Sequence, residues 1–590
     1  MYRTHHCNEL RKTDIGHAAM LAGWVHVRRD HGGVIFIDLR DREGLTQVVF
    51  RPEENAELAA QAHHLRHEDV IEVEGRISAR VPGTENPKLP TGDIELVPDR
   101  LRILNRADVL PFPLDAEVSN EDLRLSYRYF DLRRPQMARN LRLRHKVTKA
   151  ARDFLDEKGF VEVETPILSK STPEGARDFL VPSRLTQGKF YALPQAPQQY
   201  KQLLMVGGIE KYFQIAKCFR DEDLRADRQP EFTQIDIEAS FVVPEDIFGL
   251  VEGLLAAMFR AGQGREIPTS FPRLTYAQAM DEFGSDKPDR RFAMKLTDLA
   301  DIFGSSSFKM FRGALDAGGA VKAINAKGFA SLTIGQSDEL TAMAKQYGAK
   351  GLAFIKVENG EWKSPIVKFF AEAEKEALRA KLQVEEGDLI LFAADKWEVV
   401  CEVLGRIRTR VAEMQKLTAA SSQLDFLWVT DFPLMAFNPD ENKWNAVHHP
   451  FTRPKSEDIE KLKAEKYGEV RAEAYDVVLN GVELGGGSIR IHEPELQATI
   501  FGALGVNDED QQSMFGHMLR AFRLGAPPHG GIAFGLDRIV MLICGEESIR
   551  EVMAFPKNNR GIDLMSHSPS EVDSRQLRDL GIKIAEEKKG

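Results

Sequence analysis

The chain has 590 residues, of which 43% are apolar and 29% charged, and its net charge is −11. This composition is that of a globular protein with several domains, and the negative charge argues against a protein that coats nucleic acid over its whole surface. The four cysteines lie far apart, which argues against a disulfide framework and excludes a Cys-x-x-Cys zinc site. Because no apolar run approaches ~18 residues and no signal-like segment begins the chain, we expect a cytoplasmic protein with neither zinc nor a membrane partner.

The first stretch, residues 18–104, alternates apolar and polar side chains over short segments that turn residues separate. It predicts a helical segment at 53–66 and strands around 19–30, 33–40, 45–50, 69–81 and 93–104. Five strands with a helix after the third are typical of an OB-fold β-barrel. In the second strand Ile35, Ile37 and Leu39 form the core side, so Phe36 lies on the outer face.

The outer face of this barrel combines an aromatic ring with polar side chains. Phe36 is expected beside Arg28, Arg29 and Gln47. An aromatic ring suits stacking on a base and arginine suits a phosphate, so this face predicts a single-stranded nucleic-acid site. An incidental surface phenylalanine is the alternative, and the pattern alone favours neither.

A proline-rich connector, Leu110–Leu114, leads to a predicted helix at about 137–158. A short strand follows in Gly159-Phe-Val-Glu-Val-Glu-Thr-Pro-Ile-Leu168 and ends at the proline. A helix and strand of this kind are generic when they are considered alone.

Residues 212–241 predict two alternating strands joined by a polar loop. The first strand ends at Arg220, and one face of the second carries Gln234, Asp236 and Glu238. Alternation alone favours a solvated sheet face, but a face with these groups is costly to bury without a ligand. The loop adds donors suited to phosphates or a purine, namely Arg225, Arg228 and Gln229.

Residues 475–490 predict a hairpin around the Asn480-Gly481 turn. Pairing outward from the turn matches Val478 with Glu483 and puts Asp476 on the face of Glu483, roughly 7–8 Å away. Two carboxylates so placed suit Mg²⁺, whose octahedral shell is completed by waters and phosphate oxygens. A solvated hairpin is the alternative, but it does not explain the glycine run that follows, which implies a close approach of the backbone to another group.

Near the C-terminus, Gly530-Gly-Ile-Ala-Phe-Gly-Leu-Asp-Arg538 predicts a strand followed by an apolar helix with Arg538 in its first turn. Together with Phe219-Arg-Asp-Glu222, this segment resembles motifs 2 and 3 of the class II aminoacyl-tRNA synthetases, whose two arginines bind the α- and γ-phosphates of ATP. Residues 159–168 resemble motif 1, which builds the dimer interface. The N-terminal barrel and a block inserted at 289–424 make the whole chain similar to the bacterial aspartyl-tRNA synthetases.

The resemblance implies a multidomain α/β (α+β) fold: an N-terminal OB-fold β-barrel, a class II antiparallel-sheet catalytic domain and an inserted α+β domain. The expected boundaries are 1–106 for the anticodon-binding barrel, 107–136 for a hinge, 137–288 and 425–564 for the two parts of the catalytic domain, 289–424 for the insertion and 565–590 for a C-terminal extension. Because every residue assigned below lies outside the insertion, we expect the insertion to be dispensable for adenylate formation.

The resemblance also assigns side chains to each ligand, with Arg220 and Arg538 as the catalytic residues. The residues implied for ATP are Arg220, Asp221, Glu222, Gln229, Glu483, Gly535, Leu536, Asp537 and Arg538. Those implied for aspartate are Glu174, Gln198, Lys201, Arg220, Asp236, His448 and Arg490, with Lys201 and Arg490 on the side-chain carboxylate. Asp476 and Glu483 would hold the Mg²⁺ that accompanies ATP. The residues implied for anticodon binding and discrimination are Arg29, His31, Phe36, Gln47, Gly83 and Glu95.

The implied reaction joins L-aspartate to tRNA(Asp) in two steps, through aspartyl-adenylate, on a homodimeric enzyme. His31 and Gly83 resemble the non-discriminating members of the family, which implies tRNA(Asn) as a second substrate. An asparaginyl- or lysyl-tRNA synthetase is the nearest alternative, and the Lys201–Arg490 pair and the large insertion argue against it. A catalytically inactive RNA-binding paralogue is a further alternative. Such a protein should have lost some of five residues, and all five are present here: Arg220, Glu222, Asp476, Glu483 and Arg538.

Overall fold

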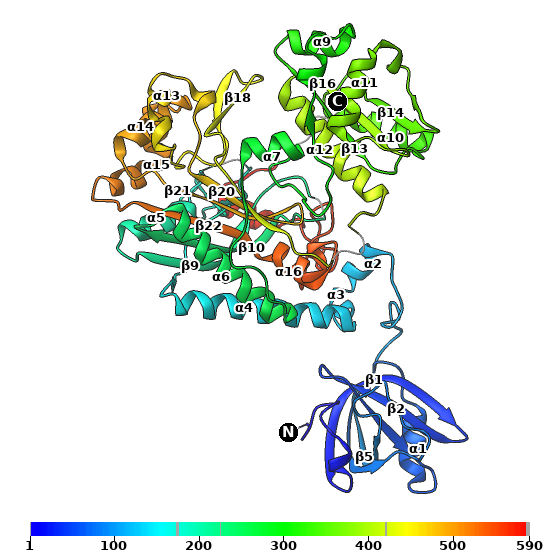
Figure 1. The fold of residues 1–590 in the computed structure, drawn as a ribbon. Helices are drawn as coiled ribbons and strands as arrows, with labels where there is room; N and C mark the ends of the chain where they lie inside the picture. The colour runs from blue at the N-terminus through cyan, green and yellow to red at the C-terminus, as the bar shows by residue number, and fades with distance from the viewer. Residues whose placement is uncertain (1, 173–175, 225, 419–421, 586–590) are drawn as a thin grey trace. The chain divides into compact units, whose positions relative to one another are not determined.

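The computed structural model describes residues 2–172, 176–224, 226–418 and 422–585. They form two compact units, Met1–Ala138 and Arg139–Gly590, each with its own hydrophobic core. Figure 1 draws the chain from the N-terminal barrel in blue to the C-terminal segments in red. Within the described ranges, no helix is both long and apolar enough to cross a bilayer.

The first unit contains a closed five-stranded barrel with the order β1-β2-β3-β5-β4, as predicted for an OB-fold. Its elements are β1 (Ala18–His31), β2 (Val34–Arg40), β3 (Leu45–Phe50), α1 (Ala56–His63), β4 (Val70–Ala79) and β5 (Ile94–Asn105). Ile35, Ile37 and Leu39 are buried because alternate side chains of a barrel strand point inward. Helix α1 begins after Asn55, whose side chain accepts a hydrogen bond from the Leu58 N–H.

The connector that follows β5 is attached to the barrel by buried charges. It contains the short helices α2 (Glu121–Ser126) and α3 (Arg128–Asp131). The Arg133 guanidinium donates to Glu68 at 2.9 Å and lies 5.1 Å from the centre of the Trp24 ring. Glu68 also accepts two hydrogen bonds of 2.8 Å from Arg40 on β2. Because charge-assisted pairs are costly to break when buried, they keep the connector against the barrel.

The second unit is built on an eight-stranded sheet with the order β11-β17-β20-β21-β22-β10-β9-β6. All neighbouring strands pair antiparallel except the two outermost pairs, β11 with β17 and β6 with β9. The strands are β6 (Val161–Glu162), β9 (Lys211–Phe219), β10 (Glu231–Ser240), β11 (Arg273–Thr275), β17 (Phe426–Thr430), β20 (Ala474–Leu479), β21 (Val482–Ile489) and β22 (His529–Gly535).

Three helices cover one face of this sheet: α4 (Pro135–Glu157), α6 (Pro244–Gln263) and α16 (Leu536–Cys544). Figure 1 shows α4 and α6 running along the same side of the sheet. Val147, Leu254 and Ile539 from these helices meet Ile235 and Ile237 of β10 in the core. The apolar half of the predicted strand pattern therefore faces the helices, and the polar half is left for the opposite face.

Smaller elements surround that opposite face. They are α5 (Gln198–Val206), the hairpins β7 (Leu180–Pro182) with β8 (Phe190–Ala192) and β18 (Met435–Asn438) with β19 (Lys443–Ala446), and the helices α13 (Ile459–Lys463), α14 (Pro494–Ala503), α15 (Asp508–Phe522) and α17 (Ser574–Leu580).

The inserted segment folds around its own sheet, which confirms the predicted fold class. The sheet is antiparallel with the order β12-β13-β16-β14-β15 and lies in sequence between α7 (Tyr276–Phe283) and β17. Its strands are β12 (Thr297–Asp298), β13 (Ala320–Ala326), β14 (Ala353–Glu358), β15 (Glu361–Lys363) and β16 (Leu389–Asp395). Its helices are α8 (Ala300–Phe303), α9 (Lys309–Asp316), α10 (Ile334–Gln346), α11 (Glu372–Leu382) and α12 (Trp397–Met414).

The β20–β21 hairpin follows the predicted register only near its turn. Val478 pairs with Glu483 as predicted, and Asn480 and Gly481 both have positive φ, as a type I′ turn requires. The register then shifts between Val477 and Val478, so that Asp476 faces Gly486 instead of the Gly485 that regular pairing would give. The prediction of uninterrupted pairing was therefore wrong by one residue, because a β-bulge adds a residue to β21.

Candidate active site

The open face of the eight-stranded sheet carries a cavity of about 680 Å³. Its walls come from the loop that follows β9, from β10, β21 and β22, from Asp476 on β20 and from the first turn of α16. A cavity of this size suits a ligand as large as a nucleotide. The predicted residues that line it are Gln198, Arg220, Glu222, Gln229, Asp236, His448, Asp476, Glu483, Gly535, Asp537 and Arg538.

Five of these side chains bury a polar atom that has no hydrogen-bond partner within the described part of the protein. The atoms are Arg220 Nε, Asp236 Oδ2, His448 Nε2, Asp476 Oδ1 and Arg538 Nε. An unsatisfied buried polar group costs about 1–3 kcal/mol, so native proteins keep few of them. Their convergence on one cavity therefore indicates a polar ligand site.

Two buried cations meet two buried carboxylates at one end of the site. Lys201 Nζ lies 2.7 Å from Asp236 Oδ1 and 3.2 Å from Glu238 Oε2. Arg490 donates to Glu238 through Nε at 2.9 Å and through Nη2 at 3.1 Å. Lys201 is 1% exposed and Arg490 2% exposed, so water screens these charges little.

The pKa values at this end are set by burial and by the two cations. Burial raises the pKa of Asp236, against the effect of Lys201. Burial acts on Glu238 in the same direction, but Arg490 and Lys201 outweigh it and lower the Glu238 pKa to about 2. The directions differ because Arg490 contacts Glu238 and not Asp236. Two fixed cations thus lie beside these two carboxylates, and the cations would also attract a ligand carboxylate.

Two neutral histidines lie on the wall next to this end. Burial lowers the pKa of His448 to about 4, and Arg490 adds to the effect. Burial and Arg490 also lower the pKa of His449, whose Nε2 lies 2.6 Å from Arg490 Nη1. The His448 ring packs edge-on against Phe432, with 4.8 Å between ring centres. Near neutral pH both rings therefore contribute hydrogen-bonding capacity without charge.

Glycines in the central strands make room for the buried carboxylates. A Cβ at Gly486 would come within 2.4 Å of Asp476 Oδ1, and one at Gly531 would come within 2.2 Å of Glu238 Oε2. Real Cβ atoms do not approach this closely, so only glycine fits at either position. Within the predicted glycine run, Gly486 therefore approaches the Asp476 carboxylate, whereas Gly485 and Gly487 approach the backbone of β22.

The opposite end of the cavity presents two arginines. Arg220 follows β9 and lies 5.1 Å from the centre of the Phe232 ring. Arg538 donates to the Glu483 carbonyl at 2.7 Å and to Asp227 at 3.1 Å. Its neighbour Asp537 is oriented away from solvent, where it accepts hydrogen bonds from Arg144 at 2.5 Å and from the Thr233 N–H at 2.7 Å. Asp537 therefore anchors the start of α16 and so positions Arg538.

The hairpin contributes a carboxylate corner between the two ends. Burial raises the pKa of Asp476, and Glu483 and then Asp286 raise it further. Asp476 and Glu483 both line the cavity, and the unpartnered Oδ1 of Asp476 is available to a ligand. Mg²⁺ takes one or two carboxylates and completes its shell with waters and phosphates, so the pair fits a nucleotide-bound Mg²⁺. Among the described residues, no group of three or more His, Cys, Asp or Glu side chains is arranged to hold a metal ion.

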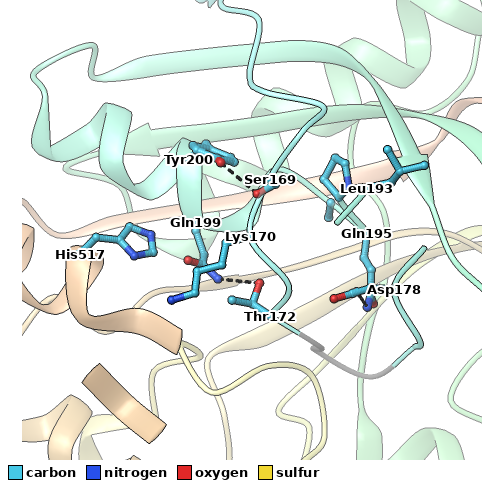
Figure 2. A pocket seen from close by; sticks show the side chains of 11 residues that line it. Ser169, Lys170, Thr172, Asp178, Leu193, Gln195, Gln199, Tyr200 and His517 are labelled. Atoms are coloured by element: carbon cyan, nitrogen blue, oxygen red, sulfur yellow. Dashed lines mark hydrogen bonds between the residues drawn. The ribbon is translucent and has the colours of Figure 1, made fainter. Parts of the chain in front are cut away.

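A small recess of about 50 Å³ shares Gln195 and Ala196 with the cavity. Figure 2 shows its lining, in which Gln199 donates to Thr172 at 3.1 Å and Ser169 lies 2.9 Å from the Tyr200 hydroxyl. These contacts fix the chain on one side of the predicted aspartate-binding residue Glu174. Glu174 itself lies outside the described residues. Ala196 stands where the resemblance leads one to expect serine.

Four predicted residues do not line the cavity. Lys201 and Arg490 lie directly behind it, bonded to the carboxylates described above. Asp221 is directed outward, with Oδ2 3.6 Å from Arg177 Nε, and Leu536 is part of the hydrophobic core. For Asp221 and Leu536, only backbone groups remain to serve a ligand.

Sequence reasoning missed three residues of the site. It placed Glu238 on the polar face of β10 but assigned it no role, although Glu238 contacts both cations. It treated His449 only as a neighbour of His448, and it did not consider Asp286, which lines the cavity. A carboxylate two residues after Asp236 was an available signal for Glu238, whereas Asp286 gave no local signal.

The predicted nucleic-acid face of the barrel carries a connected polar network. Arg29 donates to Asp38 at 2.7 Å, and its second contact is the Gln47 amide oxygen at 3.4 Å. Gln47 donates in turn to Glu95 at 2.9 Å, and Glu95 also accepts from Arg51 at 2.5 Å. The network fixes the direction of each polar group on this face.

An aromatic pair stands beside this network at the end of β1. Phe36 is opposite Arg29 in the β1–β2 register. The His31 ring packs edge-on against it, with 5.9 Å between ring centres. Gly83 has φ +86°, and a Cβ added there would meet nothing within 4 Å. Five of the six predicted residues, Arg29, His31, Phe36, Gln47 and Glu95, thus lie in one connected group, in which Gln47 and Glu95 are buried.

Comparisons with known proteins agree with this geometry. A family model described as "tRNA synthetases class II (D, K and N)" matches residues 120–559, and one described as "OB-fold nucleic acid binding domain" matches residues 19–104. The chain belongs to the class II tRNA synthetases. Relatives of this synthetase include the aspartate–tRNA(Asp/Asn) ligase of Methylacidiphilum infernorum, 58% identical over 99% of this chain and 97% of its own length. The protein of the same name from Opitutus terrae is 55% identical over 99% of both chains.

Solved structures share the fold of this synthetase at low sequence identity. The asparaginyl-tRNA synthetase from Pyrococcus horikoshii complexed with asparaginyl-adenylate matches with a TM-score of 0.59 and 20% identity, over 94% of this chain and 98% of that chain. The aspartyl tRNA synthetase from Entamoeba histolytica matches with a TM-score of 0.57 and 20% identity, over 93% and 90% of the two chains. The family models and the relatives confirm the predicted enzyme class and the OB-fold, and these solved structures agree with the fold.

Proposed function

We propose that this synthetase is an aspartate–tRNA(Asp/Asn) ligase, which activates L-aspartate with ATP and transfers it to tRNA(Asp) and to tRNA(Asn). The observation that supports this most directly is the pair of buried cations, Lys201 and Arg490, behind a cavity that also presents Arg220 and Arg538. These cations would attract an amino acid with a side-chain carboxylate. The names of relatives that are more than 50% identical over nearly the whole chain point to the same reaction.

The first step needs no side-chain nucleophile. The α-carboxylate of aspartate attacks the α-phosphorus of ATP in line, an oxygen–phosphorus bond forms, and pyrophosphate leaves. Arg220 would stabilise negative charge on the α-phosphate and Arg538 on the γ-phosphate, so the rate comes from position and electrostatics. Mg²⁺ held by Asp476 and Glu483 would neutralise further phosphate charge. In the second step the 3′-terminal hydroxyl of the tRNA attacks the activated carbonyl and releases AMP.

The substrate ammonium is assigned to Asp236, with Gln198 and Glu174 beside it. The unpartnered Oδ2 of Asp236 supports this assignment because an ammonium is a strong donor. The side-chain carboxylate is assigned to Lys201 and Arg490. Asparagine would offer the two cations no carboxylate of its own, and lysine would be repelled by them. These charges are the reason to prefer aspartate over the other two amino acids of the family.

Charging of tRNA(Asn) is supported by the barrel. The anticodons for Asp and Asn differ at the third base, where cytosine offers an N4 donor and uracil an O4 acceptor. A neutral imidazole at His31 can present either a donor or an acceptor by changing tautomer. At Gly83 there is no side chain to exclude either base. Together they suit a barrel, residues 1–106, that accepts both anticodons.

A homodimer is also proposed. The 159–168 segment that resembles motif 1 exposes apolar side chains at Val161 (51%), Ile167 (42%) and Leu168 (52%). A second copy of the chain would cover them. Analytical ultracentrifugation tests this directly: a mass near 133 kDa, twice the 66.3 kDa of one chain, is expected, and a monomer at micromolar concentration would refute it.

Two assays test the proposed reaction. ATP–pyrophosphate exchange should depend on aspartate and should not occur with asparagine or lysine at the same concentration. Exchange that is equally fast with asparagine would refute the proposed specificity. Aspartylation of purified tRNA(Asp) and tRNA(Asn) transcripts should then proceed with similar efficiency. A value of kcat/KM a thousandfold lower for tRNA(Asn), on the order of 4 kcal/mol, would show a discriminating enzyme.

A further inference from the structure

A short turn at Gly284–Asp289 leads from α7 into the inserted domain and passes the carboxylate corner of the cavity. Asp286 lines the cavity together with Asp476 and Glu483. Lys287 Nζ lies 3.9 Å from Glu483 Oε2, and the Lys287 side chain is 47% exposed. The turn therefore brings one anion and one cation to the corner assigned to Mg²⁺ and the ATP phosphates.

The start of the turn is held against α12 of the inserted domain. Gly284 has φ +65°, and its added Cβ would come within 2.2 Å of the Cys401 carbonyl. A Cβ at Gly405 would come within 2.1 Å of the Gly284 carbonyl. The two backbones are thus in direct contact, and neither position has room for a side chain.

The end of the turn is held by Arg408, also on α12. Its buried guanidinium donates to the carbonyls of Asp289 at 2.7 Å, Phe292 at 3.1 Å and Met294. It lies 4.0 Å from the centre of the Phe292 ring and 5.1 Å from that of Phe283. Arg408 therefore fixes three backbone groups where the chain passes from the turn into the inserted domain.

The turn also touches the hairpin that carries the metal residues. The Cβ of Asp289 lies 3.0 Å from the place that a Cβ on Gly481 would occupy. Arg290, the next residue, forms two hydrogen bonds with Asp425, at 2.9 and 2.6 Å, just before β17. A displacement of the turn would consequently also move the β20–β21 hairpin.

We propose that Asp286 and Lys287 are positioning residues of the Mg²⁺–ATP site and that the inserted domain holds them there through Arg408. Asp286 would accept hydrogen bonds from water molecules bound to the Mg²⁺, since Mg²⁺ keeps several waters in protein sites. Lys287 would pair with the phosphates as a point charge. The inserted domain would then be needed for nucleotide binding, contrary to the dispensability that the sequence suggests. This inference rests on the proposed Mg²⁺ site at Asp476 and Glu483.

The test is calorimetric binding of ATP to the full-length enzyme without aspartate, so that no turnover contributes. In Asp286→Asn, the Mg²⁺ concentration that gives half-maximal ATP binding should rise about tenfold, within the range that outer-shell changes produce. In Lys287→Met, the Kd of ATP at saturating Mg²⁺ should rise about threefold to fivefold, as for a partly exposed charge. Binding of aspartate alone should stay at the wild-type value in both variants.

Two variants test the role of the inserted domain and two serve as controls. Arg408→Met should weaken Mg²⁺-dependent ATP binding at least as much as Asp286→Asn, and Arg408→Lys should recover part of the loss. Asp316→Asn and Lys295→Met remove charges that pair with Arg312 and Glu282, and neither residue lines the cavity. Both controls should bind ATP normally. Normal ATP binding by a folded Arg408→Met would show that the inserted domain does not hold the turn.

Glu483→Gln separates failure of this inference from failure of the proposed Mg²⁺ site. If Glu483→Gln changes the Mg²⁺ dependence while Asp286→Asn and Lys287→Met bind ATP as the wild type does, the inference is wrong and the Mg²⁺ site stands. If Glu483→Gln also leaves the Mg²⁺ dependence unchanged, the metal is bound elsewhere and both fail.

Discussion

Arg490 donates two hydrogen bonds to Glu238, of 2.9 and 3.1 Å, and both side chains are buried. The same carboxylate lies 3.2 Å from Lys201 Nζ, so a single residue of β10 orients both cations of the aspartate end. A pre-oriented pair loses little side-chain entropy when the substrate binds. Glu238 is therefore as important to the proposed specificity as the cations that would touch the substrate.

Replacing Glu238 tests this relationship. Glu238→Gln keeps the shape of the side chain but removes the charge that lies between Lys201 and Arg490, so we expect unfolding to become easier by about 3 kcal/mol. The KM for aspartate should rise, while the KM for ATP should stay nearly unchanged. Urea denaturation and pyrophosphate exchange measure the two effects. Glu266→Gln, which removes an exposed partner of Arg260, is the control and should match the wild type.

Removing one cation should abolish activation of aspartate. Arg490→Leu deletes a buried, charge-assisted contact and leaves Glu238 with Lys201 alone, which typically costs about 2–5 kcal/mol. Aspartate-dependent pyrophosphate exchange should fall below detection, although Mg²⁺–ATP still binds. Fluorescence or calorimetric titration with aspartate is the second readout. Wild-type aspartate affinity in this variant would contradict the assignment of Arg490 to the side-chain carboxylate.

His448 should make the fold sensitive to mild acid. Burial lowers its pKa to about 4, below the ordinary value of 6.5. Between these pH values His448 therefore binds a proton in the unfolded chain but not in the folded chain. This contribution to stability is complete above pH 6.5 and is lost as the pH falls from 6.5 towards 4. At pH 5 it amounts to about 2 kcal/mol.

When the pH falls from 7 to 5, the free energy of unfolding should therefore decrease less in His448→Gln than in the wild type. The difference between the two decreases should be about 2 kcal/mol. Urea denaturation at the two pH values measures it. His145→Gln, which replaces an exposed histidine of α4, should leave the pH dependence as it is in the wild type. Equal acid sensitivity of His448→Gln and the wild type would mean that His448 is readily protonated in the folded enzyme.

The sequence predicts the sheets of this protein better than its carboxylate contacts. Strict alternation marks β2 and β10, since one face must pack on a core, and the structure buries Ile35, Ile37, Ile235 and Ile237 accordingly. The turn at Asn480 is likewise encoded locally. The bulge that shifts Asp476 from Gly485 to Gly486 is not, because it depends on how β21 packs between β20 and β22.

Partners that are distant in sequence set the limit of prediction in the site. Alternation places Asp236 and Glu238 on the same face, but it cannot tell which of them meets Arg490, 252 residues after Glu238. The Glu238 carboxylate also needs the space left by the missing side chain of Gly531, on another strand. Asp286 reaches the cavity from a turn whose end is hydrogen-bonded to Arg408 of α12, more than 100 residues later. No periodic pattern carries such information.

The two tautomers open to the His31 imidazole lead to a prediction for both tRNAs. His31→Phe keeps the edge-on packing against Phe36, 5.9 Å between ring centres, but removes the atom that can donate or accept. Because the imidazole would serve cytosine and uracil alike, kcat/KM should fall for tRNA(Asp) and for tRNA(Asn) by a similar factor, about tenfold for a contact of 1–2 kcal/mol. Aspartylation of the two transcripts at one salt concentration measures this, since phosphate contacts make affinity depend on salt.

His64→Phe, which replaces an exposed histidine at the end of α1, is the control. A loss confined to one transcript would show that His31 holds a single tautomer and acts as a discriminating residue.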